Sequence, residues 1–294
     1  MTKRRVAAVD IGTNSCRLLI ADLEDKAAVS QVLATLRTTR IGEGAEENGL
    51  LREAPMERTI SALKEYLVLI NDLQVSRLRI VATSAVREAA NAAFFLNYVK
   101  ETTGLAVEII SGREEARLNY IGACHAVDVE GTGAVLDIGG GSTEFTYLSQ
   151  NGELYCSSVP LGAVRLTERP RLLSEILNPM RHILHHIKSV PHPALIGVGG
   201  TITTLAAVDQ ALCVYDPELI QGYPLSKNSV ERIMFSLAVK NSEERKKVPG
   251  LQPERADIIV AGTTILWALL TYLQAPLITV SEADMLQGII LEML

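Results

Sequence analysis

The sequence predicts an α/β fold built from two related halves, and three glycine turns carry that prediction. At residues 6–15 an apolar run meets Asp-Ile-Gly, two turn residues and a serine, and residues 135–142 repeat this order in register. A third glycine turn follows another apolar run, at residues 196–203. Short apolar runs bounded by turns are typical of buried strands. Two strand–turn–strand units so far apart in the chain indicate a duplicated fold with one anion-binding loop in each half.

Length and composition limit the classes of function. With 294 residues, the chain is long enough for two domains of ordinary size, each with its own core. Its net charge of −6 argues against broad binding to nucleic acid or to an anionic membrane, because no domain-wide basic field exists. A polyanionic substrate would therefore need local help from a metal ion, backbone N–H groups and a few arginines.

The cysteines and the apolar segments favour a cytoplasmic protein. Cys16, Cys124, Cys156 and Cys213 are scattered without a C-x-x-C pair, which fits reduced thiols better than disulfides or a zinc site. Asp10 interrupts the apolar run after the basic first residues, so we expect no signal peptide. Residues 258–273 are the most apolar stretch, but they are too few and too diluted by small residues for a membrane span, so a buried helix is predicted.

The first half is expected to contain strands and helices that alternate after an initial antiparallel hairpin. Strands are predicted over residues 4–11, 16–22, 28–36, 78–82 and 107–110. A polar, glycine-rich loop is predicted over 42–49. Pro55 begins a helix, because proline suits a first helical turn. Gly104 ends another helix that starts at Phe94.

The junction after the fourth strand contains an arginine in an unexpected place. Thr83 and Ser84 have hydroxyls typical of helix N-caps, which would put Arg87 in a first helical turn. A cation there opposes the helix dipole. Arg87 therefore either pairs with a surface acid or faces a bound anion near the helix N-terminus. The anion is favoured, because strand-to-helix junctions are common ligand edges.

Two neighbouring acids begin the helix after the fifth strand. Ser111 followed by Glu114 forms a capping-box pattern, which assigns Glu114 to the backbone. Glu115, about 100° further round the helix, is left for another role. The alternative is that Glu115 is an acid that merely benefits from the helix dipole.

The run from Asp137 to Glu144 is the most informative stretch of the chain. Three consecutive glycines allow close backbone approach to a ligand, and successive N–H groups in such a turn form an anion-binding concavity. The two flanking carboxylates repel phosphate but can hold Mg²⁺, which bridges protein acids to substrate phosphates. The alternative is a tight β-hairpin whose acids are only solvated.

The second half continues the alternation of strands and helices. Strands are predicted over residues 153–159 and 277–280, and a strand followed by a turn over 195–200. Helices are predicted over 181–188, 202–208, 227–241, 258–273 and 284–294. His182, His185 and His186 share one helical face, and an exposed face is favoured over a metal site because no further ligand is in view.

The boundary between the halves is predicted near Gly122, which gives domains of residues 1–122 and 123–294. The terminal helix can pack back on the first domain. The site is expected in the cleft between the domains, because ligands commonly bind where two domains meet.

Five motifs stand in a fixed order, at residues 10–15, 83–89, 111–116, 137–144 and 197–201. Together they resemble the exopolyphosphatase/guanosine pentaphosphate phosphohydrolase family, which belongs to the actin-like ATPase superfamily. The resemblance implies two ribonuclease-H-like α/β domains flanking a cleft, and Mg²⁺-dependent hydrolysis of a terminal phosphoanhydride. The chain resembles the short, two-domain form. Residues 284–288, Asp-Met-Leu-Gln-Gly, depart from the Gly-Leu-Arg-Glu-Gly expected there, which bears on chain-length preference.

The resemblance also implies roles for individual residues. Glu115 matches the general base, and Asp137 and Glu144 match the metal-associated acids, with Mg²⁺ as cofactor and Mn²⁺ as its substitute. The segments that contact phosphate contain Asp10, Thr13, Asn14, Ser15, Arg87, Gly139, Gly140, Gly141, Ser142, Gly199, Gly200 and Thr201.

The implied reaction is the release of orthophosphate from the end of inorganic polyphosphate. Guanosine pentaphosphate is the alternative substrate. A weakly catalytic sensor of guanosine alarmones and a kinase of the same superfamily are further alternatives. Polyphosphate or an alarmone is thus the expected partner, without nucleic acid or membrane, and a homodimer is compatible with the resemblance.

Overall fold

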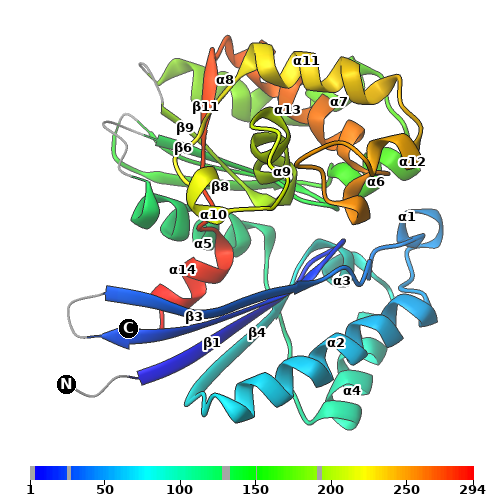
Figure 1. Cartoon of the computed structure of the whole chain (residues 1–294), viewed down its shortest axis with the longest axis vertical. Coiled ribbons are helices and arrows are strands. Elements are labelled where there is room, and N and C mark those ends of the chain that lie inside the picture. Colours follow the sequence, from blue (N-terminus) through cyan, green and yellow to red (C-terminus); the bar gives the residue numbers. More distant parts are fainter. Residues whose placement is uncertain (1–3, 25–27, 128–132, 150, 191–193) are drawn as a thin grey trace. The chain divides into compact units, whose positions relative to one another are not determined.

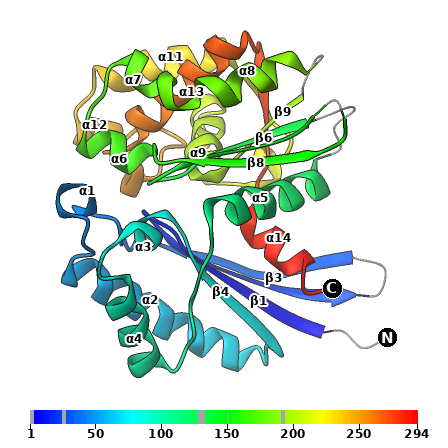
Figure 2. The ribbon, with the colours of Figure 1, turned by 180° about the vertical axis from the view of Figure 1, so that it is seen from behind.

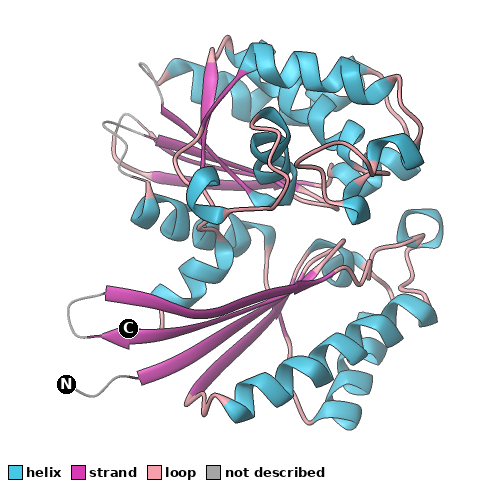
Figure 3. Cartoon of the chain, in the orientation of Figure 1, coloured by secondary structure: helices cyan, strands magenta, loops and turns pink. Residues whose placement is uncertain are grey.

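The computed structural model describes residues 4–24, 28–127, 133–149, 151–190 and 194–294. The chain forms two compact units, which are described separately (Figure 1). Unit 1 consists of Met1–Gly122 and Met285–Leu294, and unit 2 consists of Ala123–Asp284. Both units combine one sheet with helices, shown in Figure 3 by the magenta strands and the cyan helices.

The sheet of unit 1 has five strands in the order β3-β2-β1-β4-β5. β1, β2 and β3 form an antiparallel meander, and β4 and β5 continue the sheet parallel to β1. The strand bounds are β1 Arg4–Ile11, β2 Cys16–Glu24, β3 Ala28–Arg37, β4 Arg77–Ala82 and β5 Glu108–Ile109. The helix bounds are α1 Ala45–Asn48, α2 Glu53–Asp72, α3 Ser84–Glu88, α4 Ala92–Thr103, α5 Gly112–Ala126 and α14 Met285–Leu291.

Both faces of this sheet are covered, because successive strand residues point to opposite sides. Ala7 and Val9 of β1 belong to the core formed with α2 and α4, which lie side by side in both views (Figures 1 and 2). Val6 and Ala8 belong instead to a second cluster that includes Leu118 of α5 and five apolar side chains of the C-terminal segment. The central strand β1 is thus buried on both faces.

The sheet of unit 2 has six strands in the order β10-β11-β9-β6-β7-β8. Their bounds are β6 Gly133–Ile138, β7 Thr143–Leu148, β8 Leu154–Val159, β9 Ala194–Val198, β10 Pro224–Ser226 and β11 Leu277–Val280. The helices are α6 Ala163–Glu168, α7 Leu173–Leu177, η1 Asn178–Met180, α8 Arg181–Ser189, α9 Gly199–Asp209, α10 Pro217–Ile220, α11 Lys227–Ala238, α12 Ser242–Arg245, η2 Pro253–Arg255 and α13 Ile259–Leu273.

The two sheets have the same topology. Numbered from its own first strand, unit 1 has the order 3-2-1-4-5, and unit 2 repeats it as β8-β7-β6-β9-β11 with β10 added at the edge. In both units the first three strands are antiparallel, and the next two run parallel to the first. The predicted α/β fold with two ribonuclease-H-like domains is confirmed.

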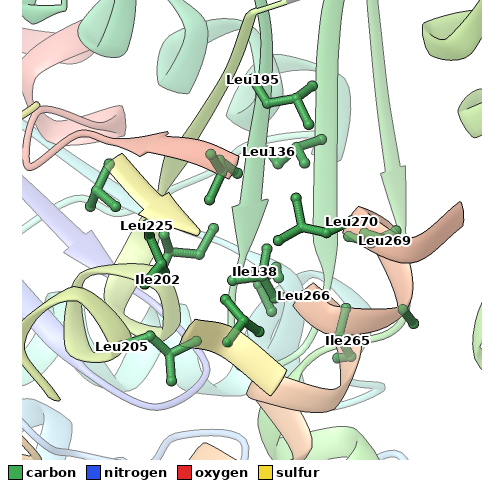
Figure 4. Close-up of a cluster of buried hydrophobic side chains, with 14 of the residues drawn as sticks. Leu136, Ile138, Leu195, Ile202, Leu205, Leu225, Ile265, Leu266, Leu269 and Leu270 are labelled. Carbon is green, nitrogen blue, oxygen red and sulfur yellow. The ribbon is translucent and has the colours of Figure 1, made fainter. Parts of the chain in front are cut away.

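The core of unit 2 confirms the buried helix predicted from the apolar stretch. Leu266, Leu269 and Leu270 of α13 pack with Leu136 and Ile138 of β6, and Figure 4 shows these side chains converging. No described helix is both long enough and apolar enough to cross a membrane.

Several local predictions were wrong. The glycine-rich segment over 42–49 contains the short helix α1, and the strand expected over 107–110 is reduced to β5. The helix expected from residue 202 already begins at Gly199. The elements α7, α10 and β10 were not predicted.

Candidate functional site

The first group of predicted residues lies on the turn between β1 and β2. Gly12 donates its backbone N–H to the Ser15 carbonyl at 3.0 Å, which closes the turn. Asp10 lies directly opposite Arg17 in the strand register. The Arg17 guanidinium donates to Asp10 Oδ2 from Nε at 3.1 Å and from Nη2 at 2.7 Å. Asp10 is only 5% exposed, whereas the Arg17 side chain is 25% exposed, so the ion pair is partly buried.

Asn14 has an unusual position on the same turn. Its side chain is buried, with 6% exposed, and neither Oδ1 nor Nδ2 has a hydrogen-bond partner among the described residues. A buried polar group without a partner costs roughly 1–3 kcal/mol, so such groups are rare and call for an explanation. The turn itself is held from outside, because the carbonyls of Thr13 and Asn14 accept from the N–H groups of Gly42 and Arg40. The amide of Asn14 is thus a rigidly placed donor and acceptor.

Arg87 and Glu115 come together in unit 1. Arg87 Nη1 donates to Glu115 Oε2 and to the Ile110 carbonyl, each at 3.0 Å. Glu115 is 7% exposed. The expectation for Arg87 rested on a first helical turn, and this was wrong: α3 has only five residues, and Arg87 lies in its last turn, where a cation suits the dipole. Its acidic partner is the predicted general base and not a surface acid.

The hydroxyls before Arg87 do not cap the helix either. Thr83 occupies the N-cap position without a side-chain capping bond, and the Ser84 hydroxyl donates to Glu88 Oε1 at 2.8 Å. Serine and threonine hydroxyls can bond to nearby side chains as well as to the backbone, and here Ser84 bonds to a side chain instead of capping the helix.

The capping box at the start of α5 forms only in part. The Glu114 N–H donates to Ser111 Oγ at 3.1 Å, as predicted. The Glu114 carboxylate does not return to the backbone of Ser111 but accepts from Arg117 Nε and Nη2, at 2.9 and 2.8 Å. The hydrogen bond from Arg117 lowers the pKa of Glu114. Glu114 is therefore paired with Arg117, whereas the buried Glu115 is paired with Arg87.

These residues gather at one edge of the unit 1 sheet. β1, β4 and β5 run parallel, so their carboxyl ends meet at the same edge. The Thr83 N–H donates to the Ile11 carbonyl at 3.2 Å, which places the start of α3 beside the turn of residues 12–15. The Ile110 N–H donates to the Ala82 carbonyl at 3.2 Å, which places the start of α5 next to both.

The glycine loop of unit 2 joins two antiparallel strands, so its backbone is a β-hairpin. Asp137 lies directly opposite Glu144, and Gly139 donates to the Ser142 carbonyl at 3.0 Å. The alternative interpretation was thus right about the hairpin. It was wrong about a solvated Glu144, which is only 2% exposed, whereas Asp137 is partly exposed. Ser158 Oγ donates to Glu144 Oε1 at 2.6 Å.

The start of α6 fixes the glycine loop. The N–H groups of Ala163 and Val164 donate to the carbonyls of Gly139 and Gly140, at 2.9 and 2.8 Å. Arg165 Nε donates to the Gly141 carbonyl at 2.9 Å. With these carbonyl oxygens bound by protein, the loop is held in one conformation before any ligand arrives.

The third glycine turn lies against Asp137. Gly199 begins α9 with a φ of +83°, and a Cβ there would overlap Asp137 Oδ1, so this position requires glycine. Thr201, in the first turn of the helix, is 3% exposed. Asp137 therefore links the glycine loop with the helix N-terminus, and the predicted residues of unit 2 meet at the carboxyl ends of β6 and β9.

Arg255 was missed by sequence reasoning. A Cβ on Gly200 would overlap the Arg255 guanidinium, so that group lies directly over the N-terminus of α9. Gln252 Oε1 accepts from Arg255 Nε at 2.9 Å. A guanidinium together with helix N-terminal N–H groups is a typical anion site. The available signal was a lone arginine immediately before the buried helix.

The donor set of Asp137 and Glu144 fits a magnesium ion. Side chains directly opposite each other in an antiparallel pair have Cβ atoms about 4.5–5.5 Å apart, and two carboxylates in that relation repel. A divalent cation removes the repulsion. Within the described part of the chain no cluster of three or more His, Cys, Asp or Glu side chains could hold a metal. Two carboxylates suffice for Mg²⁺, which takes its remaining ligands from water and substrate phosphates.

Comparison with known proteins places the chain among phosphatases. A family model described as the Ppx/GppA phosphatase family matches residues 19–294. Exopolyphosphatase 2 of Mycobacterium tuberculosis is 33% identical over an alignment 318 residues long including gaps. The alignment covers 100% of this chain and 99% of that protein. The bifunctional 3-dehydroquinate synthase/phosphatase of Fusobacterium nucleatum is 35% identical over 307 residues, which cover 97% of this chain but 46% of the relative, so the chain spans about half its length. The crystal structure of the Aquifex aeolicus Ppx/GppA family member superimposes with a TM-score of 0.79, at 34% identity over 99% of this chain and 98% of that one.

Proposed function

This chain belongs to the Ppx/GppA phosphatase family and is a phosphoanhydride hydrolase, and we propose that it releases orthophosphate from the end of inorganic polyphosphate with the help of Mg²⁺. The relative named exopolyphosphatase 2, which matches the chain over its whole length, supports polyphosphate as the first substrate to consider. The same chemistry would serve guanosine pentaphosphate.

The observation that carries the proposal is the pair of carboxylates in unit 2. The two hairpins of the chain are equivalent in register, so Asp137 corresponds to Asp10 and Glu144 corresponds to Arg17. Unit 1 neutralises its aspartate with an arginine, whereas unit 2 places a second acid there. A buried acid opposite a partly buried one, next to two glycine turns, favours a divalent cation with phosphate ligands. When bound, Mg²⁺ would neutralise charge on the phosphoryl group that is transferred.

Glu115 is proposed to activate the attacking water. Its carboxylate would accept a proton while the water oxygen bonds to the terminal phosphorus. The bridging P–O bond then breaks, and its electron pair stays on the shortened polyphosphate. Phosphoryl transfer needs little covalent participation from the protein, so positioning dominates. Arg87 provides that positioning, because its Nη1 binds both Glu115 Oε2 and the fixed Ile110 carbonyl.

Three segments are proposed to bind the substrate phosphates. The N-terminus of α9 combines backbone N–H groups with the Arg255 guanidinium. Residues 140–142 of the glycine loop are further candidate N–H donors, because the Gly139 N–H already donates to the Ser142 carbonyl. On the turn of residues 12–15, the candidate is the Asn14 amide, which has no hydrogen-bond partner among the described residues. Each of these groups supplies hydrogen-bond donors within its own unit, so phosphate binding does not require a basic surface on a chain with a net charge of −6.

The proposal is tested by measuring phosphate release from polyphosphate, guanosine pentaphosphate and ATP side by side with Mg²⁺. We expect release from polyphosphate at the highest kcat/KM, and loss of release from every substrate in excess chelator. Preferential release from guanosine pentaphosphate would keep the mechanism and change the substrate. Tight nucleotide binding without release would favour the alarmone sensor, and turnover of ATP only with an acceptor would favour the kinase.

A further inference from the structure

A group of histidines in unit 2 lies apart from the residues discussed so far. α8 spans Arg181–Ser189, with Leu184 and Ile187 buried in the core and the opposite face exposed. His182, His185 and His186 are all on the exposed face. His182 and His186 are four residues apart, so they lie one above the other on successive turns of the helix.

The distance between these two rings has a chemical meaning. The Nε2 atoms of His182 and His186 are 3.3 Å apart, and the ring centroids are 4.5 Å apart. Imidazole nitrogens bind Zn²⁺ at about 2.0–2.1 Å, so two of them at tetrahedral angles on one ion are separated by about 3.3 Å. The pair is thus already spaced to bind one metal ion through both nitrogens. Without a metal, the same spacing suits a hydrogen bond from one neutral ring to the other.

The neighbouring cations are directed elsewhere. Arg181 Nη2 donates to Asn178 Oδ1 at 3.4 Å. Lys188 Nζ donates to the Tyr272 carbonyl at 3.5 Å and lies 5.9 Å from the centre of the Tyr272 ring. No third His, Cys, Asp or Glu ligand completes a cluster among the residues described. The remaining positions of a bound ion would be filled by water.

We propose that His182 and His186 form a surface site for a divalent transition-metal ion of the Zn²⁺, Ni²⁺ or Cu²⁺ type. Imidazole suits these ions, whereas Mg²⁺ prefers oxygen ligands, so the site differs in metal preference from the pair Asp137 and Glu144. Binding joins two successive turns of the nine-residue helix α8 and therefore favours its folded form. The inference does not depend on the proposed hydrolytic function.

The test is calorimetric titration of the untagged full chain with Zn²⁺, in buffer containing saturating Mg²⁺ to occupy the carboxylate pair. We expect one Zn²⁺ to bind, and His182→Gln or His186→Gln to weaken it. Loss of an outer-shell partner alone typically lowers metal affinity 10–100-fold, so loss of a ligand should weaken binding at least about tenfold. His185→Gln is the matched control, because it removes a histidine from the same exposed face outside the close pair.

All three substitutions are at exposed positions, so the variants should fold, and thermal melts without metal would verify this. Zn²⁺ should raise the unfolding temperature of the wild type and of His185→Gln, but not of the other two variants. Equal Zn²⁺ affinity in all four proteins, or absence of a titratable Zn²⁺ site, would overturn the proposal and leave the pair as a hydrogen bond.

Discussion

Asp137 lies directly opposite Glu144 in the β6–β7 hairpin, in the register position where Asp10 of the β1–β2 hairpin lies opposite Arg17. In unit 1 a guanidinium nitrogen is 2.7 Å from the aspartate, whereas in unit 2 a second carboxylate occupies the corresponding place. Like charges in this relation destabilise a sheet by about 0.2–1 kcal/mol. The two hairpins thus have the same strand register. They differ at the position opposite the aspartate, where Arg17 forms an ion pair and Glu144 favours a cation site.

Glu144→Gln should separate stability from activity. The amide oxygen still accepts the hydrogen bond from Ser158, while the repulsion with Asp137 is removed. In excess chelator the variant should therefore melt at the same temperature as the wild type or higher, with a gain of up to about 1 kcal/mol. Phosphate release should fall, and the Mg²⁺ concentration needed for half-maximal rate should rise. Thermal melts and Mg²⁺ titrations measure the two effects.

Glu153→Gln is the control for that variant. Glu153 is exposed and accepts a hydrogen bond from the exposed Tyr155 hydroxyl, so its loss removes the same charge without touching the acid pair. Its Mg²⁺ requirement should match that of the wild type. If Glu144→Gln released phosphate at the full rate in excess chelator, the metal role of this acid would be ruled out.

Arg87→Lys should lower kcat more than it changes KM. Lysine keeps the positive charge but lacks the planar guanidinium that binds Glu115 and the Ile110 carbonyl together. A small misplacement of a catalytic group can cost about 10²-fold in rate, so we expect a loss of about 10- to 100-fold. Arg87→Ala should also weaken polyphosphate binding, and that part of the loss should shrink as salt screens the charge.

Arg79→Ala provides the comparison for Arg87. Arg79 binds Glu108 at 3.0 Å and Glu292 at 3.1 Å, so the same charge is removed from unit 1 without disturbing Glu115. Its kinetic constants should stay close to those of the wild type. A variant Arg87→Lys that only melts earlier, with unchanged kcat, would show that the ion pair is structural.

Asn14→Ala should weaken substrate binding without destabilising the protein. Its buried amide has no hydrogen-bond partner among the described residues, so its removal relieves a desolvation cost. If the amide binds phosphate, the variant should bind polyphosphate more weakly by roughly 1–3 kcal/mol. Binding titrations and chemical denaturation measure the two quantities.

Asn119→Ala is the opposite case. Asn119 is also buried, but its Oδ1 accepts the Met285 N–H at 2.9 Å, so this variant should lose roughly 1–3 kcal/mol of stability and keep its substrate affinity. If Asn14→Ala destabilised the chain as much as Asn119→Ala does, the Asn14 amide would have a structural role.

The fold could be predicted because its signals are local. Most strands are short apolar runs, and the Asp-Ile-Gly turn reappears in register, so the α/β class and the duplication follow from the pattern. The ribonuclease-H-like topology was implied by the family resemblance. The opposition of Asp137 and Glu144 is also local, since a four-residue turn of residues 139–142 fixes which residues face each other.

The remaining features depend on contacts or boundaries that a pattern does not contain. Arg255 lies over Gly200, which is 55 positions earlier in the chain, and only the packed structure brings them together. Arg87 was expected in a first helical turn, but α3 has only five residues and Arg87 lies in its last turn. The Glu114 carboxylate accepts from Arg117, three residues away, instead of from the backbone N–H of Ser111. The spacing of three residues on a helix favours such an ion pair, and it competes with the capping box.

Glu114→Gln should cost stability and spare activity. The hydrogen bond from Arg117 lowers the pKa of Glu114 below its ordinary value of 4.5. A lowered pKa means that the carboxylate stabilises the folded state above that ordinary value, and that the contribution is lost as pH falls through the folded pKa. Because the pair is partly exposed, the variant should be less stable at pH 7 by at most about 1 kcal/mol. Chemical denaturation at pH 7 and below pH 4 should show the difference disappearing.

The central claim is that Glu115 activates the water, and the most direct measurement compares phosphate release by Glu115→Gln with that by Glu114→Gln. Glutamine at 115 can still accept from Arg87 but cannot take a proton from water. We predict a loss in kcat of about 10²–10⁴ for Glu115→Gln, with little change in substrate affinity or unfolding temperature, and nearly full activity for Glu114→Gln. Equal kinetic losses in the two variants, or a Glu115→Gln variant that only melts earlier, would contradict the account.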